Sequence, residues 1–274
     1  MLSMDEIQQA LPGTLDPEDF DPSVYEDSFL KARNINITDA DILSGFRKGI
    51  DLLKYIIENS FKAATMQGPK TLESRLSDES KGIYAEVKRK LIDFLYQAFS
   101  NISLSKNGIP FRQWHDEKCK EMIDIFKGLK NKDGSPAWTY GISQKILNLI
   151  IKYLVVITKK AYKLGVSKGS STIVKAGQVF LDIYPELDIP VDSRILVASW
   201  NHNLGHKVKL ILPSRDGSVV PAAGIEPWNW RSNKVVKPWT QWNRDDYLKY
   251  AESLHKVFAK PLDWEGYAWT EAGR

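Results

Sequence analysis

The segment from Ser143 to about Tyr162 is the most apolar part of the chain, and it limits the possible folds more than any other feature. Its longest apolar run, Ile146 to Ile157, is interrupted by Lys152. A membrane-spanning helix needs about 20 consecutive apolar residues, so this run is too short to cross a bilayer. The first residues, MLSMDEIQQA, lack the basic end and apolar stretch of a signal peptide. We therefore expect a soluble, cytoplasmic protein that has no membrane partner.

Other segments repeat apolar residues at spacings of three or four, which indicates amphipathic helices. Besides residues 143–162, four helices are predicted. The first starts near Asp39, with Asp39 or Asp41 as its cap, and continues to Ile57. The others cover roughly 81–99, the segment from the Asn107–Gly108 turn to Phe126, and 245–258. The predicted fold class is mainly α.

Three shorter features complete the predicted organisation. Residues 164–178 have the composition of a loop, because Gly, Ser and Lys dominate their first half. A short helix is expected to begin at Asp192 or Ser193, just after Ile189–Pro190. Residues 207–212 can form a strand, which predicts a small β-hairpin near 207–220.

The net charge of +4 conceals an uneven distribution of charge. Residues 1–30 contain eight acidic side chains and no Lys or Arg, so the rest of the chain has a net charge of +12. This division predicts an acidic N-terminal arm over residues 1–37 and a single helical domain over 38–274. A body with such a basic excess is compatible with a polyanionic partner, although many basic proteins bind none.

Cysteine and histidine are too sparse for the common metal centres. The single Cys119 excludes an internal disulfide, a four-cysteine zinc site and a four-cysteine iron–sulfur cluster. His202 and His206 have the spacing of two ligands on one helix face, but Asn203-Leu204-Gly205 between them is a poor helix former. We expect two loop histidines, and no metal or other cofactor.

The first segment with chemical potential is Thr139-Tyr140-Gly141-Ile142-Ser143-Gln144-Lys145-Ile146-Leu147-Asn148. Gly141 permits a tight turn, and Ser143 can cap a helix that follows it. The unpaired amides at such a helix start can bind a phosphate. Lys145 is then one turn into the same helix, close to that phosphate.

The second segment is Ile189-Pro190-Val191-Asp192-Ser193-Arg194-Ile195. Pro190 disfavours helix before it, so Asp192 falls at or beside the N-cap of the next helix. There its carboxylate accepts backbone N–H bonds, which favour the ionised form. A positioned amine and an ionised carboxylate can form a Schiff base or stabilise developing positive charge. Taken singly, a lysine near a helix start and a capping aspartate are more often only structural.

Together these segments resemble the helix-hairpin-helix DNA glycosylase superfamily, which includes endonuclease III and 8-oxoguanine glycosylases. In that family a hairpin of the type Leu-Pro-Gly-Val-Gly-x-Lys leads into a buried helix, and a later Pro-Val-Asp-Thr/Ser segment carries the catalytic aspartate. Residues 141–145 match the hairpin and its lysine, Asn148 matches a following Asn, and Pro190-Val191-Asp192-Ser193 matches without a gap. The resemblance implies a two-lobed helical bundle with its cleft near residues 141–145 and 192.

By the logic of this family, Lys145 is the nucleophile at the sugar C1′ and Asp192 assists departure of the base. The chain departs from the pattern at Tyr140, which replaces the hairpin proline, and at Ser143, which replaces the second glycine. Residues 159–187 look like an insertion, and no cysteine cluster follows Asp192, so no iron–sulfur cluster is expected.

The resemblance implies DNA as the partner. The predicted DNA-binding residues are small, polar, basic or aromatic. They are Gly141, Ser143, Gln144, Asn148, Lys168, Lys175, Arg194, Trp228, Trp230 and Trp239. For these three tryptophans, stacking on a flipped base and packing on the core are equally expected. Trp264 and Trp269 are expected to pack, and Glu265 between them is an acid whose burial the sequence does not reveal.

Three functions follow as hypotheses. The first is a DNA glycosylase that excises a damaged base, or a hypermodified base of phage DNA in antiviral defence, with or without lyase activity. The second is a transferase that modifies a base within phage DNA. The third is a non-enzymatic helical module that binds nucleic acid or protein, in which Asp192 is only a cap. The base, the strand preference and the oligomeric state are left open.

Overall fold

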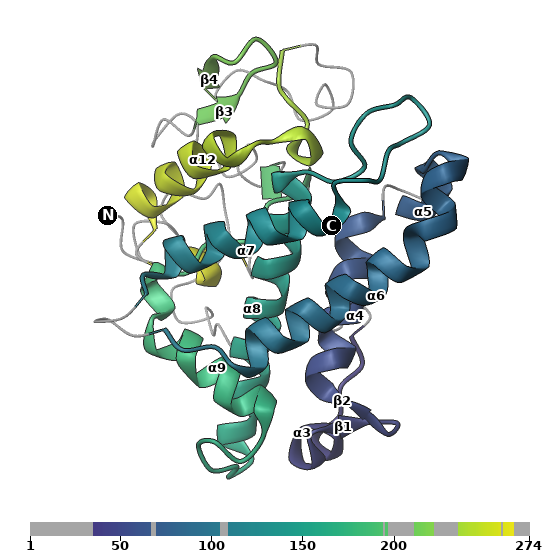
Figure 1. The fold of residues 1–274 in the computed structure, drawn as a ribbon. Helices are drawn as coiled ribbons and strands as arrows, with labels where there is room; N and C mark the ends of the chain where they lie inside the picture. Colours follow the sequence, from purple (N-terminus) through teal and green to yellow (C-terminus); the bar gives the residue numbers. More distant parts are fainter. Residues whose placement is uncertain are drawn as a thin grey trace. The chain divides into compact units, whose positions relative to one another are not determined.

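A computed structural model describes residues 35–66, 70–104, 109–193, 195–196, 211–221, 235–258 and 260–265. These residues are mainly helical, as predicted, and they include two small antiparallel hairpins. The chain divides into two compact units, residues 35–184 and residues 185–274 together with the first 34 residues (Figure 1). The predicted acidic arm lies almost wholly outside the described residues.

The unit of residues 35–184 is built around helix α8 (Tyr140–Lys163), which has its other helices packed around it (Figure 1). Every residue from Tyr140 to Thr158 is buried, because apolar side chains occur all round the helix. The helices that contact α8 are α3 (Asp39–Ser44), α4 (Leu52–Thr65), α7 (Phe111–Phe126) and α9 (Thr172–Asp182). Helix α6 (Asp78–Ser100) packs on α4, α7 and α9, and a single turn, α5 (Leu72–Arg75), precedes it.

Helix α8 is long and apolar enough to cross a membrane by length and composition alone, so the expectation that this segment is too short to do so is wrong. Its most apolar window is, however, entirely buried inside the folded chain. This burial is what the central helix of a packed bundle requires.

The first predicted helix is wrong as a continuous element. The chain instead forms α3, a hairpin of β1 (Phe46–Arg47) with β2 (Ile50–Asp51), and then α4. The break begins at Gly45, which ends α3 because its φ of 73° lies in the left-handed region. The cap of α3 is Thr38, not Asp39 or Asp41; Asp41 completes the capping box, and Asp51 caps α4.

The prediction of a loop over residues 164–178 is also wrong in its second half. Helix α9 begins at Thr172, capped by Ser171, and lies against α8. The Gly- and Ser-rich composition ends at Ser171, and the apolar Ile173, Val174 and Phe180 are buried. The segment that looked like an insertion is therefore a connection followed by a core helix.

The second unit contains a hairpin of β3 (Ile211–Pro213) with β4 (Val219–Pro221), and β3 contacts α12 (Arg244–Val257). The 3₁₀ turn η2 (Tyr184–Glu186) spans the boundary between the two units in the sequence, and η4 (Trp239–Gln241) lies between β4 and α12 in the chain. The predicted hairpin near 207–220 is confirmed over the described residues, and the predicted helix over 245–258 is confirmed within one residue at each end. Trp264 is buried and stacks on Phe258, so its predicted packing role is confirmed; Trp269 lies outside the described residues.

A candidate site of buried lysine and aspartate

The start of α8 differs from the predicted glycine turn. Thr139 is the N-cap, with extended backbone and a side-chain oxygen that accepts from the amide of Ile142. Gly141 and Ser143 therefore lie inside the first turn of the helix, and neither the predicted turn at Gly141 nor the predicted cap at Ser143 is present. The phosphate seat inferred from that turn has no support here.

Ser143 has a different role, which its position explains. Its hydroxyl accepts a hydrogen bond of 2.8 Å from the buried indole Nε1 of Trp138, just before the helix. The same indole stacks on Phe126 with 3.8 Å between ring centroids. Ser143 and the aromatic pair thereby fix the angle at which the chain enters α8.

A run of polar side chains continues from Ser143 along α8 in the centre of the unit. Gln144 donates to the carbonyl of Gly141 at 2.8 Å, and Asn148 donates to Gln144 at 3.3 Å. Lys145 lies between them and is only 5% exposed. The predicted residues Gly141, Ser143, Gln144, Lys145 and Asn148 are thus brought together on the first three turns of one buried helix.

Lys152 belongs to the same face, and sequence reasoning missed it. It follows Lys145 by seven residues, which is two helical turns, and is 3% exposed. Two buried lysines on a core helix are unusual, since Lys is among the residues least often fully buried. The available signal was the absence of acids: residues 134–181 contain seven lysines and no Asp or Glu.

Asp192 occupies the position predicted for it. Its Oδ1 accepts from the amide of Ile195 at 3.2 Å, and its carbonyl accepts from Leu196, so it caps the helical turn that follows Pro190. Asp192 is 5% exposed. The predicted N-cap is confirmed, and the carboxylate is held by a backbone donor inside the protein.

A second buried acid, Asp188, lies one turn before Asp192 in the chain and was not singled out from the sequence. Its Oδ1 lies 2.8 Å from Nε2 of His255, near the end of α12. This pair links the segment before Pro190 to the C-terminal helix of the same unit. No local sequence pattern joins residues 188 and 255, so only the fold reveals the contact. Glu265 is also fully buried in this unit.

Tyr140, which replaces the hairpin proline of the glycosylase family, is anchored to α7. Its hydroxyl donates to Oδ1 of Asp116 at 3.2 Å, and Lys120 pairs with the other oxygen of that carboxylate at 2.7 Å. Burial raises the pKa of Tyr140 far above its ordinary value, and the nearby Cys119 and Asp116 raise it further. Tyr140 therefore stays protonated and serves as a hydrogen-bond donor. His115 on α7 is buried beside Cys119.

The remaining predicted DNA-binding residues are in the connection after α8, on α9, in the other unit, or outside the described residues. Lys168 is exposed in the connection between α8 and α9, and Lys175 is exposed on α9. Both therefore belong to the end of α8 opposite Lys145. Trp239 is partly exposed in η4, whereas Arg194, Trp228 and Trp230 lie outside the described residues.

The described residues contain no group of three His, Cys, Asp or Glu side chains that could hold a metal ion. His202 and His206, the pair considered from the sequence, are not among them.

No family model matches the chain, and neither the curated proteins nor the solved structures include one that matches it. The site is therefore interpreted from its own residues and geometry.

Proposed function

We propose that the chain is a DNA glycosylase in which Lys145 is the nucleophile and Asp192 assists departure of the base. The observation that carries the proposal is the burial of both charged side chains, each near the first turn of a helix. Removing an ionic group from water costs several kcal/mol, so a buried charge is kept for a structural or a functional reason. The cap to Ile195 is the structural reason for Asp192, and the order of a lysine followed by the Pro-Val-Asp-Ser segment is what supports a catalytic role for both.

The two side chains have complementary tasks in this reaction. As the free amine, Nζ of Lys145 forms a bond to C1′ of the deoxyribose while the bond from C1′ to the base nitrogen breaks, and Nζ then gives up the proton that the leaving base takes. The leaving base takes a proton, and the carboxylate of Asp192 stabilises the positive charge that spreads over C1′ and the ring oxygen as the bond breaks. Opening of the deoxyribose ring then gives an imine between Nζ and C1′, which borohydride reduces or water hydrolyses, or from which β-elimination of the 3′ phosphate follows.

Charge along α8 supports a polyanionic substrate. Lys145 and Lys152 are followed on nearly the same helix face by Lys159 and Lys163, toward the exposed end. Lys159 lies over the ring of Tyr184, with 4.7 Å from its Nζ to the ring centroid. The lysines thus continue from the buried site to the surface, where they can contact phosphates.

The experiment is to incubate the protein with duplexes that carry a panel of damaged and modified bases, phage DNA included, in the presence of borohydride. Wild-type protein is expected to release a base and form a covalent adduct. Lys145→Gln should abolish the adduct. Lys152→Gln is the matched control, since it removes another buried lysine from the same helix face. If the panel yields neither abasic product nor adduct, the proposal is wrong.

A further inference from the structure

Apolar side chains are exposed together on one short segment of the 35–184 unit. Leu43 is 58% exposed, Phe46 53% and Ile50 43%. These are three of the eight large apolar side chains that are exposed among the described residues, and they fall within eight positions. Isolated exposed apolar residues need no explanation, but a cluster of them indicates an interaction site.

The turn between Phe46 and Ile50 places a lysine at a costly position. The hairpin turns through Lys48, with a φ of 48°, and Gly49, with a φ of 78°. A two-residue turn with both φ values positive strongly prefers Asn-Gly or Asp-Gly. Lys48 is the single non-glycine residue with positive φ in the described part of the chain. Left-handed backbone costs a lysine about 1 kcal/mol, and such strain tends to persist at functional sites.

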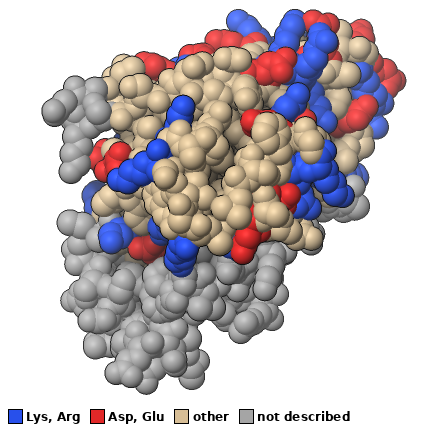
Figure 2. All heavy atoms as spheres, turned by 90° about the horizontal axis from the view of Figure 1, so that it is seen from below, with Lys and Arg blue, Asp and Glu red and all other residues tan. Residues whose placement is uncertain are grey.

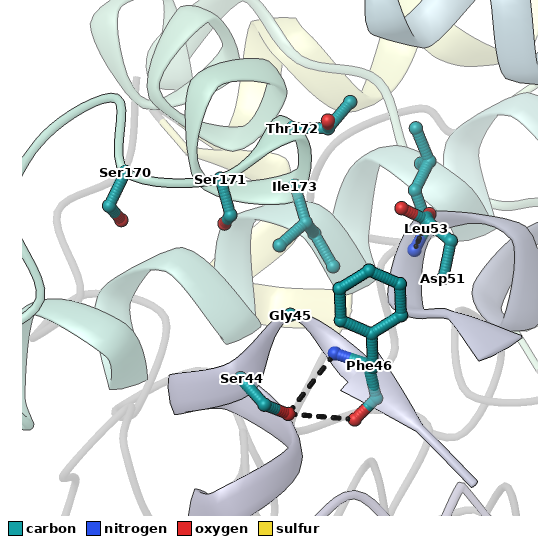
Figure 3. Close-up of a pocket in the computed structure, with 9 residues that line it drawn as sticks. All are labelled: Ser44, Gly45, Phe46, Asp51, Leu53, Ser170, Ser171, Thr172 and Ile173. Atoms are coloured by element: carbon teal, nitrogen blue, oxygen red, sulfur yellow. Dashed lines mark hydrogen bonds between the residues drawn. The ribbon is translucent and has the colours of Figure 1, made fainter. Parts of the chain in front are cut away.

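A pocket of about 220 Å³ separates this hairpin from the start of α9 (Figure 3). The hydroxyls of Ser170 and Ser171 and the side chain of Ile173 point toward the strand that carries Phe46. Gly45 lies beside Ser171, since a Cβ there would be in ordinary contact at 3.6 Å from that of Ser171, and its φ of 73° is what favours glycine at this position. The pocket combines an aromatic edge with hydroxyl groups that can donate hydrogen bonds.

Basic side chains surround this cluster. Arg47 is paired with Asp41 at 2.7 Å, whereas Lys48, Lys168 and Lys175 form no ion pair with any described residue. The stem of Lys175 passes 3.7 Å from the position of a Cβ on Gly169, so its amine belongs to the turn before α9. Figure 2 shows this end of the molecule, with uncharged side chains in the middle and lysine and arginine, together with some acids, around them.

We propose that this surface, called the hairpin surface and consisting of Leu43, Phe46, Lys48, Ile50, Lys168, Ser170, Ser171 and Lys175, binds duplex DNA. The three lysines and two hydroxyls contact phosphates, and Phe46 and Ile50 contact the minor groove. Phosphate contacts from lysine and hydroxyl groups next to apolar side chains that press on base edges are typical of minor-groove binding. This inference rests on the proposed function, because it adds a second DNA contact to the same substrate.

The position of the surface along α8 predicts how long the DNA must be. Gly177 of α9 lies opposite Leu154 and Thr158, so the start of α9, five residues earlier, is close to the level of Lys163. Lys163 follows Lys145 by 18 residues, or about 27 Å along the helix axis. For a duplex that runs parallel to the axis of α8, at 3.4 Å per base pair, this length corresponds to about eight base pairs between the hairpin surface and the target nucleotide.

The test measures affinity for duplexes that carry a stable abasic-site analogue, by fluorescence anisotropy at several salt concentrations. Lys48→Asn removes the charge and suits the turn better than lysine does, so loss of folding cannot explain loss of binding. It is expected to weaken binding about eightfold at 0.1 M salt and to reduce the slope of log K against log salt by about 0.9. The double variant F46S/I50S should weaken binding severalfold with little change in slope.

The matched controls lie on the exposed face of α6. Ile83→Ser removes an apolar side chain that is 47% exposed, and Lys90→Asn removes a surface lysine. Both should bind DNA like wild type. Shortening the duplex to four base pairs on one side of the target should make Lys48→Asn and wild type bind equally.

Each result bears on one of the two proposals. If wild type binds DNA and forms the borohydride adduct, but the hairpin variants bind as the controls do, the hairpin surface is not a DNA site and the glycosylase proposal stands. If wild type binds no DNA, both proposals are wrong. If the hairpin variants lose binding to vesicles of anionic phospholipid and keep their affinity for DNA, the surface is a membrane contact and the inference is overturned.

Discussion

Gly177 is the position where the packing of α9 on α8 is most sensitive to substitution. A Cβ at residue 177 would lie 2.0 Å from Oγ1 of Thr158 and 2.6 Å from the carbonyl oxygen of Leu154. Neither distance is tolerable, and the second involves backbone, which cannot rotate away. Gly177→Ala therefore has to push the two helices apart.

The direction of the change separates packing from helix propensity. Alanine in an isolated helix is more favourable than glycine by about 1 kcal/mol, so an exposed or loosely packed α9 would be stabilised. Overpacking a core costs about 1–3 kcal/mol and occasionally more. We expect a net loss of about 2 kcal/mol in the free energy of unfolding, which corresponds to a fall of about 4–8 °C in Tm for a unit of this size.

The assay is urea unfolding and thermal melting, followed by circular dichroism. Adding Thr158→Ala to Gly177→Ala removes the nearer contact but not the carbonyl of Leu154, so the double variant should recover part of the loss and no more. A Gly177→Ala protein as stable as wild type, or more stable, would refute the α8–α9 packing described above.

Three further outcomes follow from single contacts. Burial raises the pKa of Tyr84 to about 12, so above pH 10 this tyrosine ionises in the unfolded chain before it does in the folded one. The free energy of unfolding should therefore fall by roughly 2 kcal/mol between pH 10 and 12. In thermal melts over that range, the stability of Tyr84→Phe should fall less than that of wild type. Ser143→Ala leaves the buried indole N–H of Trp138 without its acceptor and should cost about 1–3 kcal/mol in urea unfolding. Asp192→Asn keeps a good cap for Ile195 and should be nearly as stable as wild type, whereas Asp192→Ala should lose about 1 kcal/mol in the free energy of unfolding. Both variants should lose base release. An Asp192→Asn protein that still releases the base would show that Asp192 is only a cap.

The longer helices were predictable because each buries an apolar face of regular spacing. The predicted helix over 81–99 is α6 (Asp78–Ser100), and the predicted helix over 143–162 is α8 (Tyr140–Lys163). Both observed helices begin three residues before the predicted starts, because their N-caps, Ser77 and Thr139, lie upstream of the first periodic apolar residue. Capping depends on a single side chain, and several polar residues near each start were plausible.

The errors arose where local sequence permits two structures. Residues 39–57 keep helical spacing throughout, but positive φ at Gly45, Lys48 and Gly49 turns the chain back into a hairpin. Residues 164–178 contain enough Gly and Ser for a loop, yet Gly177 is there to let α9 approach α8. In both cases a glycine that serves a turn or a close contact was interpreted as a sign of flexibility or was ignored.

For the candidate site, the sequence predicted the cap at Asp192 and directed attention to Lys145. It did not predict that Lys145 is buried, nor that Lys152 is buried two turns further along, because periodicity places a residue on a face but does not show what covers that face. The pairing of Asp188 with His255 depends on the return of α12 to the segment before Pro190, which no local pattern encodes.

The most direct test of the central claim is borohydride trapping on duplexes with modified bases, with wild type, Lys145→Gln and Lys152→Gln compared side by side. The account predicts a covalent band with the combined mass of protein and DNA for wild type and Lys152→Gln, and no such band for Lys145→Gln. An adduct that persists in Lys145→Gln would contradict the assignment of the nucleophile. The absence of both adduct and abasic product from wild type across the whole panel would contradict the glycosylase proposal itself.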